Sequence, residues 1–136
     1  MKTVTIDASC VISWLFPEQR TRAADRLLLG GFALWAAPDI FAWEVGNFVA
    51  RRAMQGRADA AQVQAKLSLL DVRVTAPRQS DAVMALIPQA VANDLSLFDT
   101  AYLLHALGHG GGLASRDNRL LQAATKVGVD VFDLRD

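Results

Sequence analysis

The sequence predicts an α/β protein, with a central and mostly parallel β-sheet flanked by helices in an α/β/α sandwich. Short apolar segments with strand character alternate with longer segments whose apolar residues recur at helical spacing, and the connections between them are short. The chain has 136 residues and is 52% hydrophobic, so it can bury a core of its own. In the absence of a linker or an internal repeat, residues 1–136 are expected to form a single domain.

The first half of the chain is predicted to begin with a buried strand over Val4–Ile6, followed by a helix through Trp14. Helical spacing, glycines at helix ends and Asp59 as a helix cap predict the later segments. Pro38 suits a first helical turn. In chain order the segments are a helix over 21–29, a short strand over 33–36, a helix from Pro38 to about Gln55, and a helix ending at Leu70.

The second half continues the alternation. Pro88 lies inside a helical pattern over 80–92 and is expected to kink that helix, because proline has no amide hydrogen and its ring clashes with the preceding turn. The triplet Gly110–Gly112 predicts a flexible connector. The other predicted elements are strands over 72–74, 113–114 and 129–132, and helices over 98–107 and 118–126.

Composition narrows the class of protein. Lysine plus arginine and aspartate plus glutamate both number 14, so the net charge is zero and no global basic field points to nucleic acid. Cys10 is the single cysteine, which excludes an intrachain disulfide and a cysteine-based zinc site. The sequence has neither a signal-peptide pattern nor an apolar run long enough to span a bilayer, so we expect a cytoplasmic protein without a membrane partner.

Four acidic residues stand in apolar surroundings spread over the whole chain. Asp7 ends the first strand, Glu44 interrupts an apolar helix pattern, Asp99 follows Leu-Ser-Leu-Phe, and Asp117 follows a short strand. Carboxylates are rarely buried unless they are paired or bound to a metal. Oxygen ligands without histidine or cysteine suit a hard cation, Mg²⁺ or Mn²⁺. Such an ion activates water and stabilises the charge of a phosphodiester transition state.

The predicted topology brings these four acids together. In an open parallel sheet, ligands bind outside the carboxyl ends of the strands, and Asp7 and Asp117 follow two such ends. Glu44 is one turn from apolar residues on either side, so it lies on the inward face of its helix. Asp99 lies in the first turn of its helix, where the dipole favours an anion. We therefore predict one shared site.

Each aspartate also has a simpler interpretation. Asp7 and Asp117 could each cap the helix that follows, and Asp99 could complete a capping box with Ser96. For the aspartates taken one at a time, these alternatives stay open. Glu44 is harder to explain in this way, because an interior glutamate on an apolar face costs several kcal/mol unless it is compensated.

Five pieces of sequence together carry a resemblance to a known family. They are Ile6-Asp7-Ala8-Ser9, Trp14-Leu15-Phe16-Pro17-Glu18, Trp43-Glu44-Val45, Leu97-Phe98-Asp99-Thr100-Ala101-Tyr102, and Ala114-Ser115-Arg116-Asp117-Asn118-Arg119-Leu120. In this order and spacing, the chain resembles PIN-domain ribonucleases of the VapC toxin type over essentially its full length.

The resemblance implies a PIN-like fold whose catalytic and metal-binding acids are Asp7, Glu44, Asp99 and Asp117. It implies that Ser115 is the catalytic hydroxyl beside the last acid, at a position where the family more often has threonine. It also implies Mg²⁺-dependent cleavage of an RNA substrate, inhibition by a cognate antitoxin protein, and a homodimer.

Two other classes of function remain as alternatives. In an aspartyl-phosphate protein of the haloacid-dehalogenase type, a second acid would stand two residues after the nucleophile, where this chain has Ser9. A receiver domain would need a late lysine, and Lys126 lies inside a predicted helix. A non-catalytic interaction module would keep only the fold, and four intact acids argue against it.

Basic and aromatic residues add weaker signals. Some arginines near the acids could hold RNA phosphates, although ordinary solvated arginines explain them equally well. Trp14 and Trp43, with Phe16 nearby, are candidates for a partner groove, because tryptophan is enriched at interface hot spots, whereas Phe41 is expected in the core. His105 and His109 are four residues apart but lack a third metal ligand. The arginines are Arg51, Arg52, Arg116 and Arg119.

Overall fold

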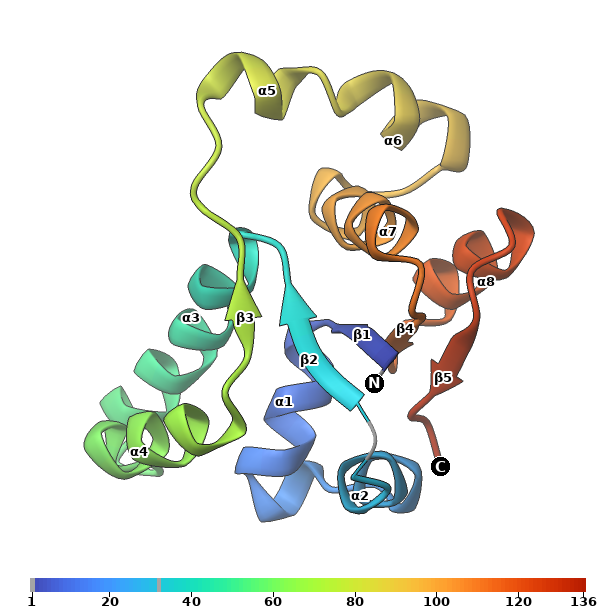
Figure 1. Cartoon of the computed structure of the whole chain (residues 1–136). Coiled ribbons are helices and arrows are strands. Elements are labelled where there is room, and N and C mark those ends of the chain that lie inside the picture. Colours follow the sequence, from blue (N-terminus) through green and yellow to red (C-terminus); the bar gives the residue numbers. More distant parts are fainter. Residues whose placement is uncertain (1, 32) are drawn as a thin grey trace.

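A computed structural model gives the structure of residues 2–31 and 33–136. Its strands are β1 (Lys2–Ile6), β2 (Ala33–Ala37), β3 (Arg73–Val74), β4 (Leu113–Ser115) and β5 (Val131–Asp133). They form a five-stranded sheet in the order β3-β2-β1-β4-β5, with every neighbouring pair parallel (Figure 1). This confirms the predicted α/β class and the parallel sheet.

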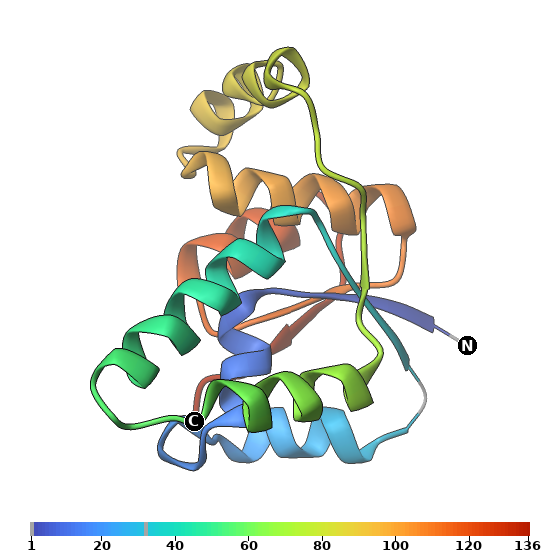
Figure 2. The same ribbon diagram turned by 90° about the vertical axis from the view of Figure 1, so that its left-hand side faces the viewer.

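The helices are α1 (Ala8–Leu15), a 3-10 turn η1 (Pro17–Gln19), α2 (Arg22–Leu29), α3 (Ile40–Met54), α4 (Ala60–Leu70), α5 (Ser80–Met84), α6 (Ile87–Asn93), α7 (Leu97–His109) and α8 (Asn118–Lys126). They cover both faces of the sheet. In Figure 2, α1, α2 and α4 lie below the strands and α7 lies above them, with α5 and α6 farther out. No helix of the described residues is both long and apolar enough to cross a bilayer.

The central strand β1 is buried because helices cover it on both sides. Val4, Thr5 and Ile6 are each at most 1% exposed, as expected for a strand inside a parallel sheet. Successive strand residues point to opposite faces. The Thr5 hydroxyl therefore meets α7, where it lies 2.7 Å from Nδ1 of His105, and its two apolar neighbours pack into the core on the α1 side.

Pro88 interrupts the predicted helix over 80–92 instead of kinking it. Two helices, α5 and α6, replace the single one, and Pro88 occupies the first turn of α6. There its missing amide hydrogen costs no hydrogen bond, whereas in a helix interior it would. The other predicted elements are present, with their ends shifted by at most two residues.

The triplet Gly110–Gly112 is not the flexible connector that the sequence predicts. Gly111 and Gly112 are buried, and the amide of Thr5 donates to the carbonyl of Gly112 at 2.9 Å. A β-carbon on Gly111 would overlap the carbonyl group of Thr3. Only glycine lets the chain pass this close to β1, so the segment is a fixed lead into β4.

Candidate active site

Asp7 is the most buried of the four acids, at 6% exposed. Its Oδ1 accepts hydrogen bonds from the amide of Cys10 at 3.0 Å and from the hydroxyl of Ser9 at 2.6 Å, and its Oδ2 accepts a short one from the hydroxyl of Ser115. Burial raises the pKa of Asp7 above its usual value, and these hydrogen bonds partly offset the rise. Asp7 is therefore held rigidly at the end of β1.

The two serines are fixed in turn by the loop after β4. The amide of Asp117 donates to the hydroxyl oxygen of Ser115 at 2.8 Å, and the amide of Arg116 donates to that of Ser9 at 3.1 Å. The parallel pairing of β1 with β4 places the two strand ends side by side. One polar network therefore joins both strand ends, with Asp7 at its centre.

Glu44 reaches the site from α3. It is half-buried, and its Oε1 accepts a hydrogen bond from the Tyr102 hydroxyl at 2.7 Å. Tyr102 is buried and lies one turn after Asp99 on the same face of α7. Burial and the bond to Glu44 raise the pKa of the Tyr102 hydroxyl, which keeps it a proton donor. Tyr102 thus supplies the compensation that a carboxylate on an apolar helix face requires.

Asp99 is the point on which the acids converge. Its pKa is raised to about 7, first by burial, then by the charge of Asp117 and a hydrogen bond with the Asp117 carboxyl group, and further by the charges of Asp7 and Glu44. All three other acids therefore act on the Asp99 carboxyl group, although the four acids come from four separate parts of the fold.

No basic side chain neutralises this cluster within the described chain. Six ion pairs join described residues, and none of them involves any of the four acids. Arg116 lies beside Asp117 in sequence but donates to the backbone and side chain of Gln19. The site therefore carries an excess of negative charge that the described residues leave unpaired.

The donor chemistry of the site fits a hard cation, although no three described His, Cys, Asp or Glu side chains are already arranged to hold one. All four acids offer oxygen ligands. Among the described residues, no amide or hydroxyl group donates a hydrogen bond to Oε2 of Glu44, to Oδ2 of Asp117 or to either carboxyl oxygen of Asp99. Like charges repel one another, and side-chain rotation onto a cation would draw the four carboxylates together.

Two of the capping interpretations are also correct. Asp7 caps α1, and Oδ1 of Asp117 caps α8 by accepting from the amides of Arg119 and Leu120. The capping box at α7 is half formed: the Ser96 hydroxyl accepts from the amide of Asp99 at 3.0 Å, and no return bond is present among the described residues. The cap of Asp117 uses only one oxygen, so capping and a shared site are compatible.

The sequence-based prediction missed two polar residues of this site, Ser9 and Tyr102. Both stand within three positions of a predicted acid, Ser9 after Asp7 and Tyr102 after Asp99. In a helix, residues three apart share a face, which is the signal that could have identified Tyr102. Ser9 has no comparable signal, because its bond to the loop after β4 depends on the strand pairing.

Most of the aromatic residues predicted to line a partner groove belong to the core. The indole N–H of Trp14 donates to the carbonyl of Ala24 at 2.8 Å, and its ring centre lies 5.0 Å from that of Trp35. Phe16 is 5% exposed. Trp43, in contrast, is 83% exposed beside Glu44. Phe41 is buried, as predicted.

The arginines near the acids likewise fall into two groups, those bound to other parts of the fold and those exposed to solvent. Arg52 forms an ion pair with Glu18 at 2.8 Å and lies over the Phe48 ring, so it is a structural residue. Arg116 is bound to Gln19. Arg51 and Arg119 are exposed and form no ion pair with a described residue.

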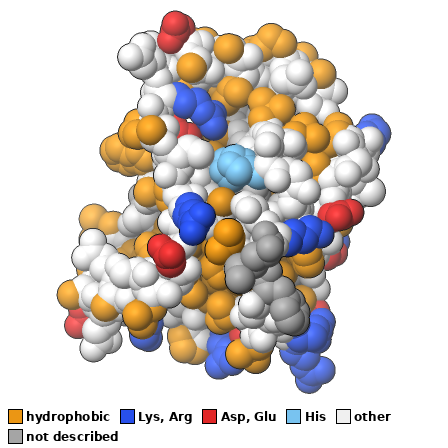
Figure 3. All heavy atoms as spheres, in the orientation of Figure 1, with side chains coloured by type: hydrophobic (Ala, Val, Ile, Leu, Met, Phe, Trp, Pro, Cys, Tyr) orange, Lys and Arg blue, Asp and Glu red, His pale blue; other side chains and the backbone are white. Residues whose placement is uncertain are grey.

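His105 and His109 form a stacked pair, with ring centres 4.1 Å apart. Nδ1 of His109 donates to the carbonyl of His105 at 2.8 Å. Burial, with the nearby His109 and Arg78, lowers the pKa of His105 to about 4. On the face of the molecule that Figure 3 shows, histidine atoms reach the surface, with Lys or Arg side chains above and below them. No third metal ligand accompanies the pair within the described chain.

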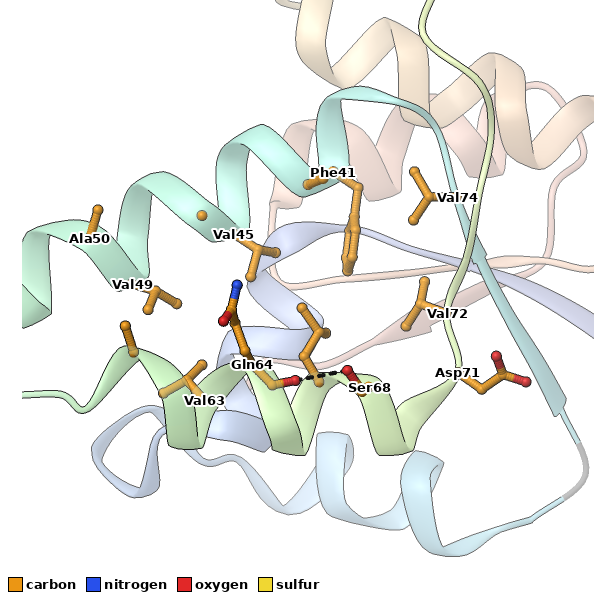
Figure 4. Close-up of a pocket in the computed structure, with 14 residues that line it drawn as sticks. Phe41, Val45, Val49, Ala50, Val63, Gln64, Ser68, Asp71, Val72 and Val74 are labelled. Carbon is orange, nitrogen blue, oxygen red and sulfur yellow. Dashed lines mark hydrogen bonds between the residues drawn. The ribbon is translucent and has the colours of Figure 1, made fainter.

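A large apolar cavity of the described structure lies away from the acids. It has a volume of about 660 Å³ between α3, α4 and β3, and apolar side chains such as Phe41, Val45 and Val63 line it (Figure 4). None of the four acids contributes to its wall. The convergence of carboxylates, and not the presence of a large cavity, therefore identifies the candidate active site.

Comparison with known proteins decides the family. The sequence pattern of the PIN domain family matches residues 4–126, a span that contains all four acids. The chain belongs to the PIN domain family. PIN domains are generally nucleases and generally use divalent metal ions.

Solved structures support the PIN fold independently. A crystal structure of PAE2754 from Pyrobaculum aerophilum matches with a TM-score of 0.67 and 22% sequence identity, covering 96% of this chain and 84% of the other. At this identity the similarity shows the fold alone. No curated protein sequence matches the chain significantly.

Proposed function

We propose that this PIN domain, over residues 1–136, is a Mg²⁺-dependent endoribonuclease of the VapC toxin type. In this proposal Asp7, Glu44, Asp99 and Asp117 bind the ion, with Ser115 beside them, and Mn²⁺ can replace Mg²⁺. The observation that carries the proposal is the convergence of the other three acids on Asp99 without a basic partner among the described residues.

The bound ion would activate a water molecule and stabilise the charge that develops on the phosphodiester. The protein's own residues prepare the site. Ser9 and Ser115 orient Asp7, and Tyr102 orients Glu44, as outer hydrogen-bond partners commonly do for metal ligands. Because the pKa of Asp99 is raised to about 7, ion binding at neutral pH would release a proton from Asp99.

The family assignment favours this proposal over the aspartyl-phosphate alternative. A non-catalytic PIN module remains the competing function, and it predicts a folded protein that cleaves no RNA. The two differ in a simple assay of total RNA and a labelled single-stranded RNA with Mg²⁺, with Mn²⁺, or with EDTA.

The decisive comparison in that assay uses two aspartate variants. Asp99→Asn should abolish cleavage while the protein stays folded. Asp130→Asn is the matched control, because Asp130 is exposed and its recorded partner is Lys2. Cleavage by the wild type in EDTA, or full activity of Asp99→Asn, would contradict the metal site.

The toxin role is a separate part of the proposal, supported by the sequence resemblance. It predicts a cytoplasmic homodimer neutralised by a cognate antitoxin encoded beside it. Expression of the wild type should stop bacterial growth, and Asp99→Asn should not. Co-expression of a short neighbouring gene should restore growth. Growth arrest by Asp99→Asn at equal protein level would argue against toxicity through RNA cleavage.

A further inference from the structure

A groove of about 460 Å³ opens between the end of α6 and one side of α8. Its walls are Ala92–Leu95 on the α6 side, and on α8 chiefly Arg119, Gln122 and Lys126. Both walls lead to the acids. Asp117 is the cap of α8, two residues before Arg119, and the α6 wall runs directly into the cap of α7, whose first turn carries Asp99.

The α8 wall carries a row of long polar side chains. Arg119, Gln122 and Lys126 are spaced by three and four residues, so they follow one face of the helix. The helical rise places the first and last about 10 Å apart along the axis. All three are exposed, and neither the arginine nor the lysine forms an ion pair with a described residue.

The basic residues of this row could offset the repulsion between the four acids and an RNA phosphate backbone. Four carboxylates repel a phosphate backbone, and the chain as a whole has no net positive charge to attract one. Attraction must therefore be local. The α8 row supplies it with two cations, Arg119 and Lys126, that form no ion pair with a described residue, in a groove that begins beside Asp117 and leads away from it.

One residue of the groove has the opposite charge. Asp94 lines it at the end of α6 with φ of 51°, a left-handed conformation that asparagine also adopts readily. Its carboxylate would weaken any phosphate binding there. Asp94→Asn therefore gives a change of charge in the groove that keeps the backbone.

We propose that this groove binds the sugar-phosphate backbone of single-stranded RNA as the strand leaves the acids, with Arg119 and Lys126 on phosphates and Gln122 hydrogen-bonding between them. The inference rests on the proposed function for the identity of the polymer. Contacts of this kind position the strand without reading its sequence. A groove formed by one helix and one helix end suits a single strand rather than a duplex.

The first test measures binding without cleavage. A fluorescent single-stranded octanucleotide is titrated in EDTA, and anisotropy gives the dissociation constant at several salt concentrations. The double variant Arg119→Ala/Lys126→Ala should bind several-fold to about tenfold more weakly. Its dependence of log K on log salt should be shallower by about 1.4, because each lost phosphate contact on a single strand removes about 0.7. The loss should be similar for different sequences.

Two further variants make the test specific. Asp94→Asn should strengthen binding of the same octanucleotide. Lys66→Ala removes an exposed lysine on α4 that lies outside the groove and should leave binding unchanged. Unchanged binding and salt dependence in the double variant would overturn the proposal, as would an equal loss in Lys66→Ala. If the double variant lost binding to an acidic peptide but kept its binding to RNA, the groove would belong to a protein partner and the proposal would also be overturned.

Cleavage separates this inference from the nuclease proposal. With Mg²⁺, the double variant should cleave the octanucleotide more slowly but cleave a dinucleotide at the wild-type rate, because a single internucleotide phosphate cannot occupy the acids and the groove together. Wild-type rates on both substrates in the double variant would overturn the groove alone. Absence of all cleavage by the wild type would overturn the nuclease proposal, while the binding measurement would still decide whether the groove holds RNA.

Discussion

The two ends of α7 bury ionisable side chains in different ways. At the first turn, burial and the charges of three other carboxyl groups raise the pKa of Asp99 to about 7. Toward the last turn, His105 is 7% exposed, and its pKa falls to about 4. Burial favours the neutral form at both ends. The ends differ in what surrounds the buried group.

At the histidine end, the chain satisfies most of its own polar atoms. Nδ1 of His105 meets the Thr5 hydroxyl, and Nδ1 of His109 meets a helix carbonyl. Nε2 of His105 is a buried atom without a partner in the described chain, but it is a single neutral atom. At the acid end, carboxyl groups of one sign gather from separate elements and no described cation offsets them. Accumulated like charge therefore marks a candidate site more reliably than burial does.

The largest expected difference between the two ends is in catalysis. Asp99→Asn should lower the rate of RNA cleavage at least about 100-fold, because losing a mere outer partner of a metal ligand already costs 10–100-fold. His109→Ala should leave the rate within about twofold, since its recorded contacts are to α7 itself. Initial rates at saturating Mg²⁺ give both values. A loss of activity in His109→Ala as large as that in Asp99→Asn would erase the distinction.

Metal-dependent stability should also belong to the acid end alone. Mg²⁺ at about 100 times its dissociation constant should stabilise the wild type by about 2.7 kcal/mol. Asp117→Asn should raise the melting temperature of the metal-free protein and remove most of the Mg²⁺ response, because asparagine still caps α8 but does not repel Asp99. Glu44→Gln should act likewise. Thermal melts with and without Mg²⁺ decide this, and a lower metal-free melting temperature in both variants would make the acids purely structural.

The two ends should give opposite dependences of stability on pH in EDTA. The folded pKa of Asp99 is raised from 3.8 to about 7, so its contribution to stability is full below pH 3.8 and is lost as the pH rises through about 7. The folded pKa of His105 is lowered from 6.5 to about 4, so its contribution is full above pH 6.5 and is lost as the pH falls toward 4.

Single variants should separate the opposite contributions of Asp99 and His105 to the pH dependence of stability. Relative to the wild type, the melting temperature of Asp99→Asn should rise more steeply with pH between about 4 and 7, and that of His105→Gln should rise less steeply or fall. Melting temperatures at intervals of pH in EDTA measure both slopes. If the curves of melting temperature against pH were parallel for the wild type and both variants, neither Asp99 nor His105 would have the shifted pKa given above.

A smaller effect is expected at the surface near the acids. Trp43→Ala should weaken binding of a cognate antitoxin about tenfold, because Trp43 is exposed beside Glu44 and tryptophan is a frequent interface hot spot. Trp14→Ala should instead lower the melting temperature, since Trp14 packs on Trp35 and bonds to Ala24. Titration calorimetry and thermal melts measure the two effects. Unchanged affinity in Trp43→Ala would remove Trp43 from the partner surface.

Local sequence pattern predicted the strands and helices well because their signals are local. The run Val4–Ile6 and the cap Asp59 act within one element, and both are present as predicted. Pro88 shows a limit of local sequence pattern. The proline predicts a defect in the helix, but whether the helix kinks or divides depends on how its two parts pack. Gly111 shows another, because its close approach to Thr3 is a contact between distant segments.

The candidate site was predictable to a similar degree. Parallel strands whose ends meet at one edge place Asp7 beside Ser115, and that follows from pattern and topology. The hydrogen bond between Tyr102 and Glu44 joins residues 58 positions apart, so only the packing of α3 near α7 reveals it. Trp14 and Trp43 look alike in sequence, yet one is a core residue and the other is exposed, because the tertiary environment decides burial.

Binding of Mn²⁺ to the metal-free protein at neutral pH, followed by the electron paramagnetic resonance signal of free Mn²⁺, tests the central claim most directly. The wild type, Asp130→Asn and His109→Ala should bind the ion with the same affinity, and Asp99→Asn should bind it at least about tenfold more weakly. No binding by the wild type at millimolar Mn²⁺, or equal affinity in Asp99→Asn, would contradict the account that the four acids form one metal site.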